Sequence, residues 1–535
     1  MRTLVIASLL ASSLVSFVSG AQAQEPPARD LVLEPIGHKD LVADHARHAL
    51  ERGPRVRDPS VVSALRAFAA PSLGPQVKRV VFGYLPYWSY TSGAPYVPLR
   101  WDMLTHLAWF AAEMDGTGAI TDKHGWGGAT TASMVADAHA HGVEVIVTVT
   151  NFTQSQIATI VGSAENRQRA IDSCLALMAE HGADGVDVDF EFVPSAAKAN
   201  FVTFMKALKD AVKAAQPNGK DGHVTLAGPS NDWNGSYDYD QLLEVTDGIM
   251  MMAYGYHYGG GNPGPASTLF AGSVWGSNLS IEWSISDYFK YGCVLDTTPT
   301  PTWCAQGNVP ANRHKIILGL PWYGHAWRVA DRTVPGTALA SGTTVFYDDS
   351  IAQFAANGRE WEPVSMSSYY HRTVSGNLQQ VWVDDAEAFA ARVAYADEMD
   401  IGGVGIWALG YEGDGPELWD SIDDVLGVAP SDPEPSPELA PEESPEPSPE
   451  AAVESVSEPE PQPEPTVEKT PDADPTTLPT TSGADAGVHA LAPQRGVSAR
   501  TIAADDGCAA GSSTSWLAAL LVVAWGARRR VSGRV

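Results

Sequence analysis

The chain of 535 residues has little positive charge. It carries 34 lysines and arginines against 64 aspartates and glutamates, a formal net charge of −30. No basic cluster marks a surface for nucleic acid, so we expect no such partner. The negative charge is uneven, because residues 431–480 hold 14 acidic residues and one lysine, a net of −13 (1 − 14). That segment is rich in Pro, Glu and Ser and cannot bury enough apolar surface to fold, so it predicts a disordered, extended spacer.

Cysteine is also scarce, with four residues in the whole chain. Cys174 lies in a helical apolar pattern and is expected to be a buried thiol. Cys293 and Cys304 flank a proline-containing loop and could form a disulfide in an oxidising compartment. Cys508 belongs to the C-terminal tail.

Long hydrophobic runs are missing, and the apolar stretches at the two ends are short. The first, Leu4 to Val18, follows Arg2 and precedes the small-residue site Ala21-Gln22-Ala23. This pattern predicts a secretory signal peptide that is cleaved before Gln24. A transmembrane anchor is the alternative, but we expect an exported protein at the cell surface or outside the cell.

The second apolar stretch, Trp516 to Ala527, is short for a permanent membrane span. It follows Cys508 and precedes the cluster Arg528–Arg530. The arrangement resembles the C-terminal sorting tails of some Gram-negative bacteria, myxobacteria especially. The resemblance implies envelope sorting machinery that acts near Cys508, and a plain tail anchor is the alternative.

Between these ends, short apolar β-rich runs alternate with amphipathic helical patterns. The runs are 77–88, 104–114, 143–152, 185–193, 223–230, 248–258, 314–324 and 401–411. Near-continuous apolar strands separated by helices indicate parallel strands covered by helices, and eight such units predict an α/β fold, a (β/α)8 barrel. The stretch from about 326 to 383 is too long for a simple connection and predicts a small α+β insertion after the seventh strand.

The expected organisation has five parts. They are a signal peptide (1–23), an N-terminal arm (24–76), the barrel (77–428), a disordered linker (429–505) and the tail (506–535). The arm has two weak helical patterns, Val42–Arg52 and Ser60–Ala70, and is interpreted as a leader, a pro-segment or a packing arm. We expect a monomer.

Acidic residues alternate along the fourth predicted strand. Asp187, Asp189 and Glu191 share one face, while Val186, Val188 and Phe190 share the other. If the apolar face packs on helices, the acids face the barrel interior, and Glu191 lies nearest the carboxyl-terminal mouth where barrel active sites occur. Crowded carboxylates cannot all ionise, so the group should titrate as a coupled set. The outermost acid could then keep a proton for general acid catalysis.

The spacing D-x-x-D-x-D-x-E, formed by Asp184, Asp187, Asp189 and Glu191, resembles the signature of glycoside hydrolase family 18, the chitinase family. Four other runs agree with that family in order: VVFGYLPYW, Met252-Ala253-Tyr254, LGLPWYG and GVGIWALGYEGDG. The similarity covers about Val77 to Gly427. It implies a glycosidase that acts on a polysaccharide containing N-acetylglucosamine, with no cofactor and no metal.

The resemblance also implies roles for individual residues. Glu191 would protonate the glycosidic oxygen, and Asp189, held by Asp187, would orient the substrate's acetamido group while its oxygen attacks the anomeric carbon. Tyr254 would hydrogen-bond that acetamido group, and Trp407 would form the floor under the sugar. The remaining positions assigned to substrate binding are Tyr84, Trp88, Met252, Trp322 and Tyr323. Asp184 is assigned a structural role, in which it caps the entry to the strand and braces Asp187.

Two departures from the family pattern bear on the substrate. Gly255 stands where the family usually has Asp, and the third strand ends in Thr148-Val149-Thr150-Asn151 instead of S-x-G-G. The second feature resembles a bacterial branch that includes spore-envelope hydrolases, so chitin and peptidoglycan-like polymers both stay open. The alternative functions are a carbohydrate-binding barrel without catalysis, a surface scaffold, and a Ca²⁺ or Mg²⁺ site at the acidic strand.

Overall fold

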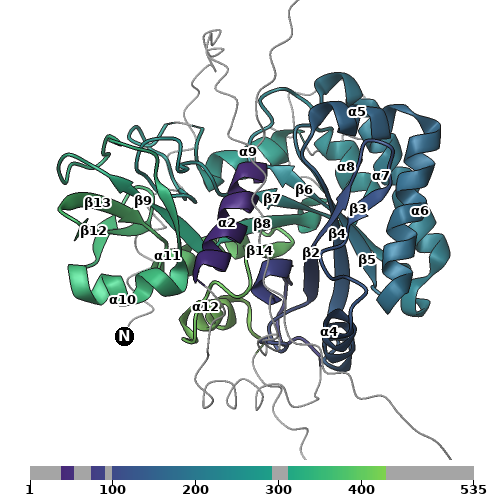
Figure 1. Ribbon diagram of the computed structural model, residues 1–535, viewed down its shortest axis with the longest axis horizontal. Coiled ribbons are helices and arrows are strands. Elements are labelled where there is room, and N and C mark those ends of the chain that lie inside the picture. The colour runs from purple at the N-terminus through teal and green to yellow at the C-terminus, as the bar shows by residue number, and fades with distance from the viewer. Residues whose placement is uncertain (1–37, 53–73, 91–98, 277, 292–310, 429–535) are drawn as a thin grey trace, which may run out of the picture. The chain divides into compact units, whose positions relative to one another are not determined.

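The computed structural model describes residues 38–52, 74–90, 99–276, 278–291 and 311–428 (Figure 1). The predicted signal peptide, the pattern at Ser60–Ala70, Cys293, Cys304 and all residues after 428 lie outside this part of the chain. Among the described helices, none combines the length and apolar character that a membrane crossing requires.

Within the described ranges, eight parallel strands close into a barrel. They are β1 (Val80–Pro86), β2 (His106–Met114), β4 (Glu144–Asn151), β5 (Gly185–Phe190), β6 (His223–Pro229), β7 (Gly248–Met252), β8 (Ile316–Pro321) and β14 (Gly403–Trp407). Each pairs with the next, and β14 pairs with β1 to complete the ring. The short β3 (Ile120–Asp122) adds to β2 in antiparallel orientation. The predicted barrel is confirmed.

Helices connect and cover most of these strands (Figure 1). They are α4 (Ala129–Ala140), α5 (Gln154–Gly162), α6 (Ala164–His181), α7 (Lys198–Ala215), α8 (Tyr239–Val245), α9 (Ile281–Tyr291), α11 (Ala386–Glu398) and α12 (Glu417–Leu426), with short 3-10 turns η1 (Tyr87–Tyr90), η2 (Ser195–Ala197), η3 (Pro217–Gly219) and η4 (Arg313–Lys315). The sequence has helical patterns at Ala129–His141, Ala164–His181, Ser195–Ala215, Tyr239–Val245 and Asp385–Met399, and these predict α4, α6, α7, α8 and α11. The patterns miss α5, α9 and α12, which have 11 residues at most and so offer few periods to recognise.

The insertion after β8 forms a separate antiparallel sheet beside the barrel. Its elements are β9 (Tyr323–Arg328), β10 (Thr343–Phe346), α10 (Tyr347–Asn357), β11 (Glu360–Glu362), β12 (Ser367–Val374) and β13 (Asn377–Trp382). The strand order is β10-β9-β13-β12-β11. This is the predicted α+β insertion, and its sheet starts three residues before the expected boundary of 326.

One further helix, α2 (His38–Arg52), comes from the N-terminal arm and extends the predicted pattern by four residues. Asp40 in its first turn and Arg52 in its last turn complement the helix dipole. No barrel strand or sheet strand of the described chain is contributed by this segment.

Local packing fixes the position of β5, which carries the acidic motif. Gly185 begins the strand where β6 approaches so closely that a Cβ atom would lie 2.1 Å from the carbonyl oxygen of His223. On the outward face, Phe190 stacks on Phe204 of α7 with ring centroids 5.8 Å apart. The apolar face of β5 therefore packs on the helices, as the alternation predicts.

Candidate active site

The three acids of β5 lie inside the barrel and are almost completely buried. Asp187 has no exposed surface, Asp189 is 5% exposed and Glu191 is 6% exposed. Glu191 follows the last residue of β5, and its backbone N–H donates to the carbonyl of Asn151 at 3.2 Å. The next residue, Phe192, has φ of 65°, a left-handed conformation that costs about 1 kcal/mol or more for a residue with a side chain. The chain therefore turns away from the direction of β5 directly after Glu191.

Asp187 is held by three hydroxyl groups. Its carboxylate accepts hydrogen bonds from Thr225 at 2.7 Å, Tyr84 at 3.0 Å and Thr148 at 3.4 Å. Burial raises the pKa of Asp187 to about 6, although these hydrogen bonds oppose the shift. Tyr84, which the resemblance assigns to the substrate, also positions Asp187 through this hydrogen bond.

The pKa of Asp189 depends on both of the other acids. Burial raises its pKa well above the usual value, and the charges of Glu191 and Asp187 raise it further. Its Oδ1 atom is buried and has no hydrogen-bond partner among the described residues. Burying a hydrogen-bond acceptor without a partner costs free energy. This oxygen is therefore suited to accept a proton, or a hydrogen bond from an N–H group of a ligand.

Tyr254 follows β7 and is also buried. Burial raises its pKa well above the usual value, and the neighbouring Tyr323, Asp189 and Glu191 add to the shift. The ring of Tyr323 lies 6.2 Å from that of Tyr254, and Met252, which ends β7, is 6% exposed. After Tyr254 the backbone turns at Gly255 with φ of 80°, a conformation that favours glycine over the aspartate usual in the resembled motif.

Trp407 ends β14 within an aromatic group. Its ring lies 4.6 Å from Phe110, 5.8 Å from Tyr84 and 6.3 Å from Trp88. The indole of Trp88 donates to the hydroxyl of Tyr411 at 3.0 Å. The structure therefore gathers Trp407, Tyr84 and Trp88, three residues that the resemblance assigns to substrate binding, in one aromatic group.

One assignment to the substrate is wrong. The ring of Trp322 packs on Trp419 of α12 at 5.2 Å and on Phe389 of α11 at 6.1 Å, and 1% of the residue is exposed. Trp322 is therefore a core side chain between the barrel and its helices.

Asp184 has the structural role expected of it, with different partners. Its carboxylate accepts from the backbone N–H of Val145 at 2.8 Å and the amide of Asn218 at 2.7 Å, and it contacts His139 Nε2 at 2.7 Å. Burial opposes ionisation, but these contacts together lower its pKa. We predicted that Asp184 braces Asp187; its contacts in the described chain instead join β4, α4 and η3.

Tyr237 is a site residue that the sequence patterns did not reveal. Its hydroxyl donates to the carbonyl of Phe190 at 2.9 Å and so supports the turn that carries Glu191. Burial raises its pKa, and the charge of Glu191 contributes next. Tyr237 comes from the loop after β6, outside any motif, so only the tertiary structure identifies it.

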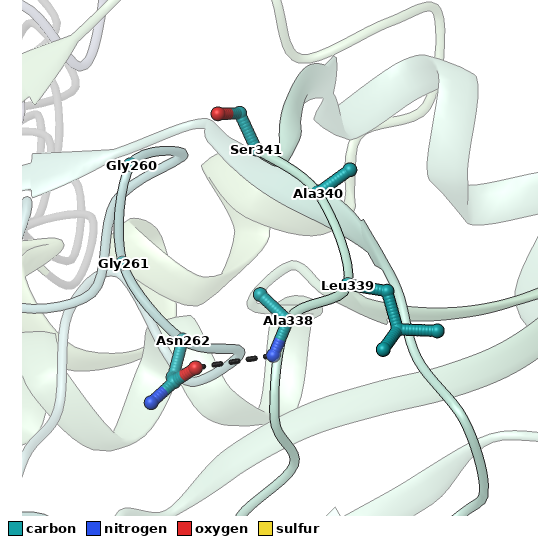
Figure 2. Close-up of a pocket in the computed structure, with 7 residues that line it drawn as sticks. All are labelled: Gly260, Gly261, Asn262, Ala338, Leu339, Ala340 and Ser341. Atoms are coloured by element: carbon teal, nitrogen blue, oxygen red, sulfur yellow. Dashed lines mark hydrogen bonds between the residues drawn. The ribbon is translucent and has the colours of Figure 1, made fainter.

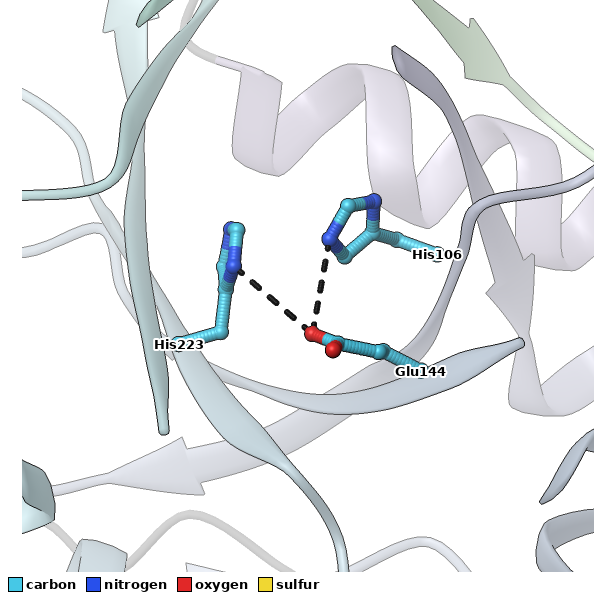
Figure 3. A group of neighbouring side chains, drawn as sticks. All are labelled: His106, Glu144 and His223. Atoms are coloured by element: carbon cyan, nitrogen blue, oxygen red, sulfur yellow. Dashed lines mark ion pairs between the residues drawn. The ribbon is translucent and has the colours of Figure 1, made fainter. Parts of the chain in front are cut away.

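Two histidines and one glutamate, residue types that can bind a metal, lie close together at the amino-terminal end of the barrel strands, opposite the acids of β5. His106, Glu144 and His223 begin β2, β4 and β6, and Figure 3 shows both imidazoles directed toward one carboxylate oxygen, at 3.6 Å and 3.9 Å. Lys220 already pairs with this carboxylate at 3.0 Å. A dication would have to lie beside that ammonium group, so we assign no metal to these residues.

A shallow hollow on the insertion side lies away from the acids. Figure 2 shows that its lining comes from the loop after β7 and the segment before β10, where Asn262 accepts from the backbone N–H of Ala338 at 3.1 Å. Its lining residues, Gly260, Gly261, Asn262, Ala338, Leu339, Ala340 and Ser341, include no predicted site residue.

A closed barrel with coupled acids at the carboxyl-terminal end of its fourth strand, flanked by aromatic side chains, defines a sugar-hydrolase type of site. Residues 80–412 match the model of the Glycosyl hydrolases family 18, and the chain belongs to this family. The resemblance inferred from the strands is thereby confirmed at the level of the family.

The similar proteins include a glycosylase associated with sporulation and a chitotriosidase. The chain is 24% identical over 284 residues to a Bacillus subtilis protein provisionally named sporulation-specific glycosylase YdhD, covering 50% of this chain and 58% of that protein. It is 25% identical over 278 residues to chitotriosidase-1 of Mus musculus, covering 48% and 56%. The matches thus span about half the length of these relatives.

Solved structures support the fold. A family 18 chitinase from Cycas revoluta in complex with (GlcNAc)4 aligns with a TM-score of 0.54 and 19% identity, over 65% of this chain and 99% of that one. The Bacillus cereus spore cortex-lytic enzyme SleL aligns with a TM-score of 0.51 and 17% identity, over 67% and 76%.

Proposed function

We propose that the protein hydrolyses β-1,4 bonds in a polysaccharide containing N-acetylglucosamine, with the substrate's own acetamido group as nucleophile. The observation that carries this proposal is Asp189, a buried carboxyl group with a raised pKa and an Oδ1 atom that lacks a hydrogen-bond partner in the described chain. An acetamido N–H is the kind of donor that this atom requires.

In this reaction Glu191 donates its proton to the glycosidic oxygen as the bond to the anomeric carbon breaks. The acetamido oxygen attacks that carbon from the other side, and Asp189 stabilises the positive charge that develops on the acetamido nitrogen. Water then attacks the resulting oxazolinium ion, and Glu191 recovers a proton from the water. Asp187, anchored by its three hydroxyl donors, keeps Asp189 in place.

Which polymer the protein cleaves is a separate question. Chitin and peptidoglycan both contain N-acetylglucosamine, and both chitinases and a spore cortex-lytic enzyme are among the similar proteins. Asn151, one of the unusual third-strand residues, bonds to the carbonyl of Met114 at 2.7 Å and to Gln156 at 2.9 Å. Its role is to support the barrel rim, so it does not itself select a polymer.

A thiazoline analogue of the oxazolinium ion tests the mechanism. The full chain should release reducing sugar from chitin, chito-oligosaccharides or peptidoglycan, and the analogue should inhibit at concentrations at least 100-fold below that of the substrate, because transition-state analogues bind far more tightly. Hydrolysis that is indifferent to the thiazoline would refute participation by the acetamido group.

We also propose export to the cell surface, on the basis of the signal-peptide pattern ending at Ala23 and the tail after Cys508. The spacer between barrel and tail would hold the barrel away from the envelope. Cell fractionation and N-terminal sequencing test this, and a mature protein that retains Met1 in the cytoplasm would refute it.

A further inference from the structure

The N-terminal helix α2 contacts the aromatic side chains at the barrel mouth. His45 of this helix has no exposed surface. The indole N–H of Trp407 donates to His45 Nδ1 at 3.1 Å, and the imidazole ring lies 4.3 Å from the ring of Tyr323, nearly perpendicular to it. Tyr411 completes the contact, with its hydroxyl 3.4 Å from the same nitrogen. An imidazole therefore occupies the group of rings that we expect to receive a sugar.

The barrel does not need this helix to close. The ring of eight described strands is complete without α2, which precedes the first strand by 27 residues (80 − 53). The apolar side chains of α2 are only partly buried, namely Leu41, Val42, Ala46 and Ala49, and Leu50 is 64% exposed. His45 is thus the most deeply inserted side chain of a helix that otherwise buries little.

Polar contacts hold α2 mainly to the inserted sheet and α10. Asp44 accepts a hydrogen bond from Thr344, His48 lies 3.2 Å from Asp349, and Arg52 pairs with Asp348. The contact of His48 with Asp349 is partly exposed, so it contributes about 1 kcal/mol or less and salt screens it. Asp348 is 3% exposed in its pair with Arg52, and departure of the helix would open this carboxylate to water. These contacts can therefore hold the helix in place and still release it.

Figure 1 draws α2 in purple between the barrel strands and the insertion. Its contacts connect Trp407 of the barrel with Thr344 and Phe346 of the insertion, where the rings of His48 and Phe346 lie 4.6 Å apart. A polysaccharide that stacks on Trp407 and Tyr323 would meet α2 in the same place.

We propose that α2 is a built-in inhibitor that occupies the sugar-binding mouth, so that docking of the helix and binding of an N-acetylated sugar chain exclude each other. The inference rests on the proposed function, since it assigns Trp407 and Tyr323 to the sugar. Activation consists of release of the helix from the mouth, with the barrel unchanged.

A reversible cross-link tests this directly in the full chain. Asp44 and Thr344 are in side-chain contact, so we choose the pair Asp44→Cys and Thr344→Cys for a disulfide, whose formation mass spectrometry checks before the assay. We expect the oxidised double variant to lose at least tenfold in kcat/KM on chito-oligosaccharides, and reductant to restore it. The variant Asp44→Cys alone, taken through the same oxidation and reduction, controls for the native cysteines.

Loosening the helix should have the opposite effect. His45→Ala and Arg52→Gln should each raise kcat/KM several-fold in the full chain. Glu51→Gln is the matched control, because it also removes one charge from the last turn, but its partner is Arg47 of the same helix and it is 61% exposed. Glu51→Gln should leave activity unchanged.

The possible outcomes separate the two proposals. Equal rates in the cross-linked, loosened and wild-type proteins would overturn the inhibitory role and leave the hydrolase function standing. Lower rates in His45→Ala and Arg52→Gln would make α2 an integral part of the site and also overturn it. If no form cleaves or binds any of the sugars, the proposed function fails and the inference falls with it.

Discussion

The two ends of the barrel each bury a cluster of ionisable side chains, and the clusters differ in how their charges are compensated. At the base, Glu144 pairs with Lys220, and burial lowers the pKa of His106 and His223, which favours the neutral form of both imidazoles. At the mouth, three carboxyl groups crowd together; burial raises the pKa of Asp187 and Asp189, and the charges of Glu191 and Asp187 raise that of Asp189 further.

This difference separates a structural cluster from a reactive one. The base lowers its electrostatic energy by pairing opposite charges and by leaving the imidazoles unprotonated. The mouth can do so only by keeping protons on acids, and Asp189 still has a buried oxygen without a partner in the described chain. A buried cluster of acids in which burial raises the pKa of two members is the better candidate for catalysis.

The largest expected effect comes from replacing one glutamate by glutamine at each end of the barrel and comparing the two variants. Glu191→Gln should reduce turnover of an aryl chito-oligosaccharide by about 10²–10⁴-fold, because the amide cannot donate the proton to the leaving sugar. Glu144→Gln, the matched control at the base, should keep turnover within about twofold. Circular dichroism should show both variants folded. Equal losses in the two variants would mean that Glu191 has no special chemical role.

The sequence predicts the parts of this contrast that depend on residues close together in the chain, and it misses the parts that depend on contacts between distant residues. Alternation along one strand places Asp187, Asp189 and Glu191 correctly, because side chains two apart share a face. It says nothing of Trp322, which was assigned from the family resemblance and lies between the end of β8 at Pro321 and the start of β9 at Tyr323, where alternation along one strand does not apply.

Contacts between distant segments have no local pattern at all. His45 and Trp407 are 362 positions apart, and Tyr237 reaches Phe190 across 47 positions. The arm could be predicted to contain a helix, but its docking at the mouth depends on side chains of β14 and of the insertion. The pairing of Asp184 with His139, 45 positions earlier, is of the same kind.

The second test compares two aspartates of the same motif. Asp189→Asn should lower kcat by about 10–10²-fold with little loss of stability, because it removes a carboxyl group whose ionisation the site opposes. It should also weaken inhibition by the thiazoline analogue.

Asp184→Asn should do the reverse. It weakens the contact with His139 and replaces a carboxylate that accepts a buried backbone N–H, so thermal unfolding should show a loss of about 1–3 kcal/mol while kcat stays near the wild-type value. If Asp184→Asn abolished turnover in a folded protein, the division of the motif into reactive and structural acids would be wrong.

The smallest effect concerns stability as a function of pH, and its sign should differ between the two ends. Burial lowers the pKa of His106 in the folded protein below 6.5, so the unfolded chain binds more protons and stability is lost as pH falls below about 6.5. Burial raises the pKa of Asp187 to about 6 from 3.8, so its contribution is full below pH 3.8 and is lost as pH rises through 6.

Urea unfolding at pH 5 and pH 8 can separate the two contributions. His106→Asn should lose less stability than the wild type on going from pH 8 to pH 5, by on the order of 1 kcal/mol, since each proton contributes about 1.4 kcal/mol per pH unit. Asp187→Asn should be less stable than the wild type at both values, because the amide cannot accept all three hydroxyl donors. Its deficit should shrink at pH 8, where the wild type bears the cost of ionising Asp187. Deficits that do not change with pH in either variant would show that the two clusters do not differ in charge compensation.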